Sequence, residues 1–171
     1  TLVGVPLGVV AARRRRFGQG LRALVGMLQT IPSLALLAML IPALGRIGIW
    51  PALVALFLYA LLPIVRNACT GLQEVPAGMR DAALALGMRP LQVLWYVELP
   101  LSLPVLLAGI KTAAIISVGT ATIAAFVGAG GYGERIVTGL ALNDATQLLG
   151  GAIPAALLAL VVQGGFGLAE Y

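Results

Sequence analysis

The 171-residue chain contains no histidine and only one cysteine, Cys69. These absences exclude a Cys/His zinc site, a histidine-based catalytic triad and a disulfide within the chain. The six Asp and Glu residues are scattered, which argues against a carboxylate pair for hydrolysis. We therefore interpret Cys69 as a small packing residue, and we expect neither catalytic residues nor a metal or cofactor bound by this chain.

Charged residues are scarce as well. They make up 10% of the chain, whereas hydrophobic residues make up 60% and the mean hydropathy is +1.03. An average soluble domain is about 25% charged, so the 11 Lys and Arg and six Asp and Glu residues are too few to cover such an apolar protein in water. The composition predicts one all-α, polytopic integral membrane domain over residues 1–171, with the lipid bilayer around it.

Five apolar stretches are candidates for membrane helices. A helix needs about 20 apolar residues to cross a bilayer, and the first stretch is only half a span. We interpret it as the tail of a helix whose beginning is missing. A signal peptide does not fit, because the arginines 13–16 follow the apolar stretch instead of preceding it. The sequence predicts about five transmembrane helices, the first truncated, from stretches 1–12, 23–44, 49–65, 101–127 and 148–168.

The basic residues lie unevenly in the connections between these stretches. Connection 13–22 holds five arginines and connection 66–100 holds three, and both fall on one side of the membrane. The opposite side holds Arg46 and Arg135, while Lys111 lies inside the fourth stretch. Cytoplasmic connections are enriched in Lys and Arg, so we place 13–22 and 66–100 in the cytoplasm. The net charge of +5 then reflects contact with anionic headgroups, and we expect no nucleic-acid partner.

Proline and glycine are placed where a bundle would bend or pack closely. Gly4 and Gly8 form a small-xxx-small pair, which allows two helices to approach closely. Prolines inside spans loosen the backbone and permit bends, as expected of a transporter rather than an inert anchor. These prolines are Pro6, Pro32, Pro42, Pro63, Pro104 and Pro154.

Segment 74–100, EVPAGMRDAALALGMRPLQVLWYVELP, is too polar to span and too long for a simple turn. Residues 81–86 favour a helix, with Asp81 near its N-terminus where the helix dipole stabilises a negative charge. Gly87 predicts a tight turn, and residues 91–97 predict a second short helix. Pro100 predicts the start of the next span. The segment therefore predicts two short cytoplasmic helices.

This segment resembles the cytoplasmic loop of ATP-binding cassette (ABC) importer permeases, whose pattern is E-A-A-x3-G-x9-I-x-L-P. The chain has every spacing of that pattern, with Asp in place of Glu and Val in place of Ile. The resemblance implies the type I ABC importer permease fold and a contact with a separate ATP-binding subunit, which would use ATP and Mg²⁺. The alternative is an amphipathic connector that only packs on the bundle. The matching residues are Asp81, Ala82, Ala83, Gly87, Val97, Leu99 and Pro100.

Four further segments look like the permeases of osmoprotectant uptake systems, which import glycine betaine, choline or carnitine. The resemblance covers residues 1–165 and is weakest at 164–167. It implies an extracellular or periplasmic solute-binding protein, a second permease copy or paralogue, and a bacterial or archaeal cell membrane. Permeases for an amino acid or other small solute, an ATP-independent secondary transporter and a structural membrane protein remain alternatives. The four segments are 29–37, 59–64, 97–101 and 126–131.

Polar residues in the fourth stretch are candidates for a translocation path. Lys111 is an intramembrane charge, which indicates function by default. It would attract the carboxylate of a zwitterion such as betaine, or it would extend towards the cytoplasmic face with Glu98 as a candidate partner. Ser117, Thr120 and Thr122 would line a polar seam or form helix–helix hydrogen bonds.

The glycine-rich stretch 128–133 formally fits the pattern G-x-G-x-x-G of dinucleotide-binding folds. Such a site needs a strand before the glycines, a helix after them and an acidic residue about 20 positions on. An apolar membrane stretch precedes the glycines here, and residue 152 is alanine. We therefore expect a flexible external turn, which a docked binding protein would contact.

Overall fold

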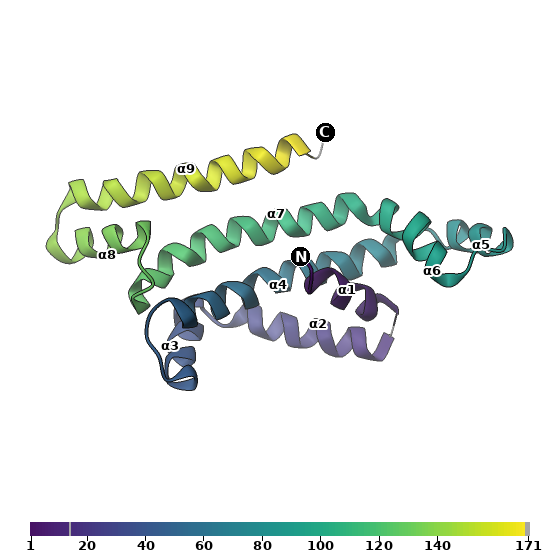
Figure 1. Ribbon diagram of the computed structural model, residues 1–171, viewed down its shortest axis with the longest axis horizontal. Coiled ribbons are helices and arrows are strands. Elements are labelled where there is room, and N and C mark those ends of the chain that lie inside the picture. Colours follow the sequence, from purple (N-terminus) through teal and green to yellow (C-terminus); the bar gives the residue numbers. More distant parts are fainter. Residues whose placement is uncertain (14, 170–171) are drawn as a thin grey trace.

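The computed structural model describes residues 1–13 and 15–169, and within these residues all regular structure is helical. Figure 1 shows an elongated bundle, with α5 and α6 at one end and α3 and α8 at the other. The α-helices are α1 (Gly4–Arg13), α2 (Arg15–Thr30), α3 (Ser33–Leu44), α4 (Ile49–Glu74), α5 (Ala77–Ala85), α6 (Pro90–Val93), α7 (Leu99–Ile123), α8 (Tyr132–Leu142) and α9 (Ala145–Ala169). A π-helical segment, η1 (Leu94–Glu98), and a 3₁₀ turn, η2 (Ala124–Val127), flank α7.

The long helices α4 and α7 form the centre of the bundle and pack through small residues. A side chain at Gly109 would lie 2.6 Å from Asn67, and one at Gly71 would lie 3.0 Å from Val105. These glycines therefore set how closely the two helices approach. Cys69 is fully buried in α4, which confirms its predicted packing role.

The short helix α1 lies against α4 through the predicted glycine pair. A Cβ atom added at Gly4 would lie 2.6 Å from Ile64, and one at Gly8 would overlap Ala68. The prediction of a small-xxx-small contact is confirmed, and its partner is α4.

The predicted second span, 23–44, is not one helix. It divides into α2 and α3, which are bent by 99° where residues 31–32 break the helix. Pro32 lacks an amide hydrogen and disfavours helix at the residue before it, so the chain turns there. The Tyr59 hydroxyl of α4 donates a hydrogen bond of 2.6 Å to the carbonyl oxygen of Ile31. The break is therefore held by a side chain of the central helix.

The segment 128–147 contains a helix of its own, which begins within the predicted external turn at 128–133. α8 begins at Tyr132 after three glycines with positive φ, namely Gly128, Gly130 and Gly131. α8 and α9 then pack as an antiparallel pair (Figure 1). Their contact is close because Gly139 and Gly151 lie against the main chain of the facing helix.

The prediction of five continuous spans is therefore too simple. Within residues 1–13 and 15–169, three helical runs are long and apolar enough to cross a membrane: 49–74, 90–127 and 145–168. The bent pair α2 and α3 is a further span only if both halves are counted together, and α1 is a shorter apolar helix. All five apolar stretches are helical, but sequence hydropathy did not show which of them are continuous.

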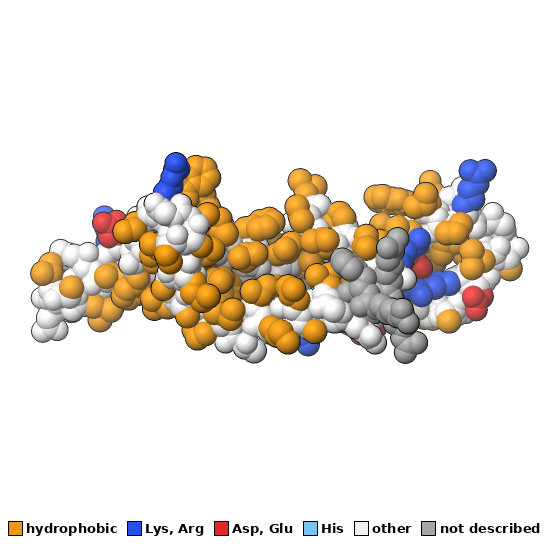
Figure 2. All heavy atoms as spheres, turned by 90° about the horizontal axis from the view of Figure 1, so that it is seen from below, with side chains coloured by type: hydrophobic (Ala, Val, Ile, Leu, Met, Phe, Trp, Pro, Cys, Tyr) orange, Lys and Arg blue, Asp and Glu red, His pale blue; other side chains and the backbone are white. Residues whose placement is uncertain are grey.

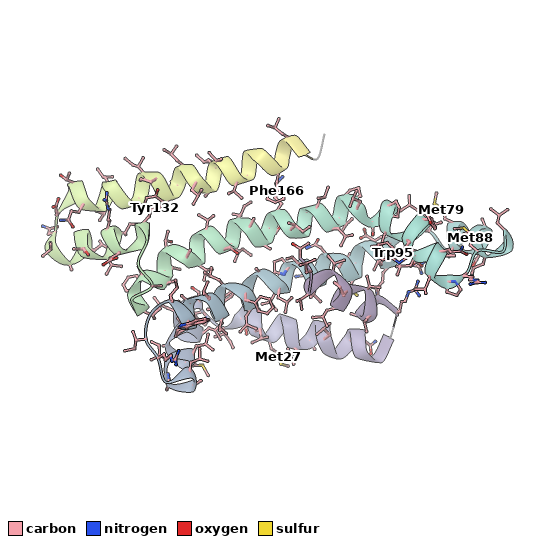
Figure 3. All side chains as sticks on the ribbon, viewed as in Figure 1. Met27, Met79, Met88, Trp95, Tyr132 and Phe166 are labelled. Carbon is pink, nitrogen blue, oxygen red and sulfur yellow. The ribbon has the colours of Figure 1, made fainter. Side chains whose placement is uncertain are left out.

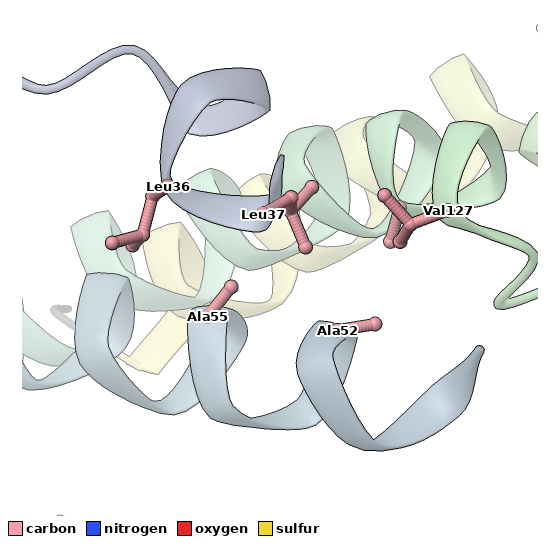
Figure 4. Close-up of a cluster of buried hydrophobic side chains, with 6 residues drawn as sticks. Leu36, Leu37, Ala52, Ala55 and Val127 are labelled. Atoms are coloured by element: carbon pink, nitrogen blue, oxygen red, sulfur yellow. The ribbon is translucent and has the colours of Figure 1, made fainter. Parts of the chain in front are cut away.

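The surface and the interior agree with a membrane setting. On the face seen in Figure 2, hydrophobic side chains cover the middle of the molecule, and charged side chains lie mainly towards its two ends. Inside, a cluster joins α3, α4 and η2 at the end that carries α8 (Figure 4). Its buried members are Leu36, Leu37, Ala52, Ala55, Ala124 and Val127.

The two predicted sets of connections lie at opposite ends. Arg13 contacts Pro90 and Glu98, so the first arginine of connection 13–22 lies at the end with α5 and α6. Gly48 donates a main-chain hydrogen bond of 2.9 Å to Val127, which brings the α3–α4 turn to the end with α8. The predicted grouping of the connections is thereby confirmed.

Candidate functional site: an exposed helix at the end of the bundle

The candidate site begins with α5, which projects beyond the membrane-spanning part of the bundle (Figure 1). α5 begins at Ala77, directly after Pro76, and ends at Ala85. Asp81 is therefore the fifth residue of the helix, beyond the first turn in which the dipole acts. The prediction that Asp81 gains from the helix N-terminus is wrong.

Gly87 ends α5 as predicted. Its φ of +82° lies in the left-handed region, which favours glycine. The amide of Gly87 donates to Leu84 and the amide of Met88 donates to Ala83, the two hydrogen bonds of a Schellman motif. The motif gives α5 a defined end and directs the chain back towards α6.

The two sides of α5 differ. Ala83 is buried and Arg80 is half-buried, so these two residues face the bundle, whereas Asp81 and Ala82 are exposed. Large apolar side chains also remain exposed here, with Leu86 84% exposed. Two methionines, Met79 and Met88, also lie in this region (Figure 3). The outward side of α5 therefore offers small and apolar groups beside one carboxylate.

Helices α6, η1 and α7 continue the chain without a break. The run from Pro90 to Val127 spans 38 residues, so Pro100 lies inside it and does not begin a span. Pro100 has no amide hydrogen to donate, and it follows the π-helical segment η1, where the regular α-helical hydrogen-bond pattern is already interrupted. Val97 and Leu99 are half-buried, and Pro100 is exposed. The pattern residues that follow Gly87 therefore lie where η1 passes into the first turn of α7, a region called here the root of α7.

A cluster of charges fixes α5 to this root. Glu98 is only 8% exposed, and its Oε1 lies 2.8 Å from Nε of Arg80. Its Oε2 lies 3.4 Å from Nη2 of Arg13, at the end of α1. Sequence reasoning did not find this cluster. The available signal was the presence of Glu98 in an otherwise apolar run, within the same segment as Arg80.

The candidate path residues do not form one site. Ser117 and Thr122 line a cavity of about 490 Å³ between the first turns of α4, the end of α7, the glycine-rich turn and α9. Their hydroxyl groups donate to Ala113 and Gly119 of their own helix, at 2.7 Å each. Thr120 is buried and does not line this cavity.

Lys111 is half-buried in the middle of α7. It lies 13 residues beyond Glu98 on the same helical run, a rise of about 20 Å. A lysine side chain cannot cover that length, and Glu98 is paired with two arginines instead. The predicted pairing of Lys111 with Glu98 is therefore wrong.

The glycine-rich turn does not have the geometry of a dinucleotide site. The 3₁₀ turn η2 precedes Gly128, where a nucleotide-binding fold would have a strand, although α8 follows the turn. The turn and the start of α8 line the 490 Å³ cavity instead.

The architecture defines a class of protein: a helical, multi-pass membrane protein with an exposed helix at one end. Within that class, the chain belongs to the family of binding-protein-dependent transport system inner membrane components, which matches residues 4–164. The resemblance to ABC importer permeases is thereby confirmed, together with a membrane location.

Named relatives and solved structures agree with this family assignment. The chain is 45% identical over 161 residues to the choline transport system permease protein OpuBB of Bacillus subtilis, covering 94% of this chain and 74% of the relative. It is 43% identical to the carnitine transport permease protein OpuCB of Listeria monocytogenes, covering 99% and 77%. Two inward-facing structures of the MetNI methionine ABC transporter match with TM-scores of 0.87 and 0.86 and 27% identity, each covering 99% of this chain and 85% of that chain. The type I importer permease fold is confirmed.

Proposed function

We propose that this chain is the permease subunit of an ATP-driven importer that carries quaternary ammonium solutes, namely glycine betaine, choline or carnitine. The observation that carries the proposal is the identity of 42–45% over nearly the whole chain to permeases named for these solutes. A further relative, at 42% identity, is the osmoprotectant import permease protein OsmW of Salmonella typhimurium. The methionine transporter structure is less similar, at 27% identity, so an amino acid is the second candidate solute.

The exposed side of α5 is the proposed seat of the ATP-binding subunit, which uses ATP and Mg²⁺. Ala82 is small and exposed, so a groove of the partner fits closely over it, and Asp81 pairs with a basic wall of that groove. Gly87 and the root of α7, with Val97, Leu99 and Pro100, complete the loop. Rigid-body motion of the ATPase then moves the bundle, as in domain closure by hinge or shear.

The remaining partners act at the opposite end and across the membrane. An extracellular or periplasmic solute-binding protein delivers the solute, and a second copy or paralogue completes the path in a bacterial or archaeal cell membrane. The exposed apolar faces of the bundle support contact with lipid and with that second subunit. Ser117 and Thr122, which line the cavity of about 490 Å³, are the proposed path residues of this chain.

The test of the ATPase seat uses two substitutions on the exposed side of α5. In the complete transporter, Asp81→Lys reverses the charge, and Ala82→Trp adds bulk where the partner fits closely. Both are expected to abolish uptake and the solute-stimulated part of ATP hydrolysis, while the permease still inserts into the membrane. Glu134→Lys makes the same charge reversal at the far end and serves as the matched control for ATPase binding. Normal transport by both α5 variants would refute the assignment of the seat.

The test of the solute is a measurement on the cognate binding protein and on uptake by proteoliposomes. We expect the binding protein to hold glycine betaine, choline or carnitine, and uptake to require ATP. Binding of methionine or another amino acid in their place would establish the second candidate. Uptake by the permease alone without ATP would show a secondary transporter.

A further inference from the structure

Glu98 is a buried carboxylate in a place that the docking of an ATPase does not require. It is the last residue of η1, directly before α7 begins at the end of the bundle that carries α5, and it is 8% exposed. It pairs with Arg80 of α5 at 2.8 Å and with Arg13 of α1 at 3.4 Å. A buried carboxylate left without its partners is strongly unfavourable. The three side chains are therefore expected to stay together when the elements that carry them move.

Each arginine also donates to a main-chain carbonyl of a further element. Arg80 donates to Leu72, in the last turn of α4, where carbonyls have no partner within the helix. Arg13 donates to Pro90, the first residue of α6, at 3.1 Å. The guanidinium group has several nitrogens, so Arg80 can donate to Leu72 through Nη2 while its Nε lies in ion-pair contact with Glu98. The cluster thus joins α1, α4, α5 and α6 at the root of α7.

The contact of α5 with the bundle depends on this cluster. Ala83 and Arg80 are the inward residues of the helix, and alanine offers only a methyl group. An alanine contact resists sliding poorly, whereas Arg80 holds the helix by its charge beside Glu98 and by its hydrogen bond to the carbonyl oxygen of Leu72. The π-helical segment η1 keeps Trp95 and Tyr96 exposed while Glu98 is buried, and π-helical turns are frequent at functional sites.

We propose that Glu98 is the positioning residue through which movement of α5 is passed to α4 and α7, by means of its pairs with Arg80 and Arg13. The inference rests on the proposed seating of an ATPase on α5. It adds that seating alone is not sufficient. Without Glu98, the ATPase binds and hydrolyses ATP, but its movement of α5 does not move α4 and α7. Arg80 is the link to α5 and α4, and Arg13 is the link that carries α1 along.

The experiment uses the complete transporter in proteoliposomes, with ATPase subunit and binding protein present. Glu98→Gln keeps the size of the side chain and removes its charge. The expected result is that the ATPase subunit stays bound and ATP hydrolysis continues, while solute taken up per ATP falls about tenfold, a typical effect of breaking coupled groups. The double variant Arg80→Gln with Glu98→Gln is expected to lose no more than Glu98→Gln alone, because the residues act as one unit.

Two further variants separate coupling from folding. Glu134→Gln makes the same change at the far end of the bundle and is expected to keep normal uptake per ATP. Arg80→Lys keeps the charge beside Glu98 but loses the fork that also reaches Leu72, so it is expected to give an intermediate ratio. A purely structural role of Glu98 would lower the amount of assembled Glu98→Gln transporter but leave the solute taken up per ATP hydrolysed unchanged. That result would overturn the proposal.

The outcomes also distinguish this proposal from the one on which it rests. Loss of ATPase binding in Asp81→Lys, together with a normal ratio in Glu98→Gln, would keep the seat on α5 and refute the role of Glu98. Normal binding and transport in Asp81→Lys and Ala82→Trp would refute the seat itself. Detachment of the ATPase subunit from Glu98→Gln would place Glu98 in docking and would equally overturn its role in transmission.

Discussion

Gly8 sets how closely α1 can approach α4, because a Cβ atom at this position would overlap the side chain of Ala68. We predict that Gly8→Val lowers the stability of the folded permease by about 1–3 kcal/mol, the usual cost of overpacking a close contact. Thermal unfolding of the purified transporter in detergent measures the loss. Gly164→Val makes the same change in α9, where no atom lies within 4 Å, and should alter the unfolding temperature much less.

Gly87 is required for its conformation rather than for its size. Its φ of +82° is costly for residues with a Cβ atom, but asparagine tolerates the left-handed region better than alanine or valine. We predict that uptake falls in the order Gly87, Gly87→Asn, Gly87→Ala, Gly87→Val, although asparagine is larger than alanine. Uptake rates per assembled transporter test this order. A series that follows side-chain volume would show that space, and not the turn, decides.

At the scale of helices, the bend between α2 and α3 depends on the hydrogen bond from Tyr59 to Ile31. Pro32 breaks the helix, and the Tyr59 hydroxyl then binds the carbonyl oxygen of Ile31 at 2.6 Å. We predict that Tyr59→Phe costs about 1–3 kcal/mol, because the partly buried carbonyl loses its donor. Proteolysis and thermal unfolding in detergent should both report a less stable bend. Tyr132→Phe removes a hydroxyl from a half-exposed tyrosine and is the control.

Sequence patterns located the long apolar helices and the exposed loop, but not α8 or the interactions between the helices. Hydropathy predicts the stretches because burial in lipid depends on composition, and the spacing from Asp81 to Pro100 predicts the exposed loop. The division of stretch 23–44 depends on Tyr59, which lies in another helix, and α8 is too short and too rich in glycine for a hydropathy signal. The pairs of Glu98 join residues up to 85 positions apart, a separation that no local pattern encodes.

At the scale of the whole molecule, the two ends of the bundle have different chemistry. One end carries the charged cluster around Glu98 and the exposed helix α5, with Trp95 and Tyr96 at its edge. The other carries the glycine-rich turn, α8 and the exposed Trp50, beside a cavity of about 490 Å³. Aromatic side chains favour the two membrane interfaces. The bundle between them is built on α4 and α7, which pack along each other from one end to the other.

The orientation of these ends is open to a direct test, because the native Cys69 is fully buried and gives a low background for thiol labelling. Ile47→Cys places a thiol at a position that is 75% exposed at the end with α8, and Ala82→Cys places one on the exposed side of α5. The excess of arginines near α5 predicts that this end is cytoplasmic. A membrane-impermeant maleimide should therefore label Ile47→Cys in intact cells or right-side-out vesicles and Ala82→Cys only in inverted vesicles. The reverse pattern would contradict the orientation, and with it the seating of a cytoplasmic ATPase on α5.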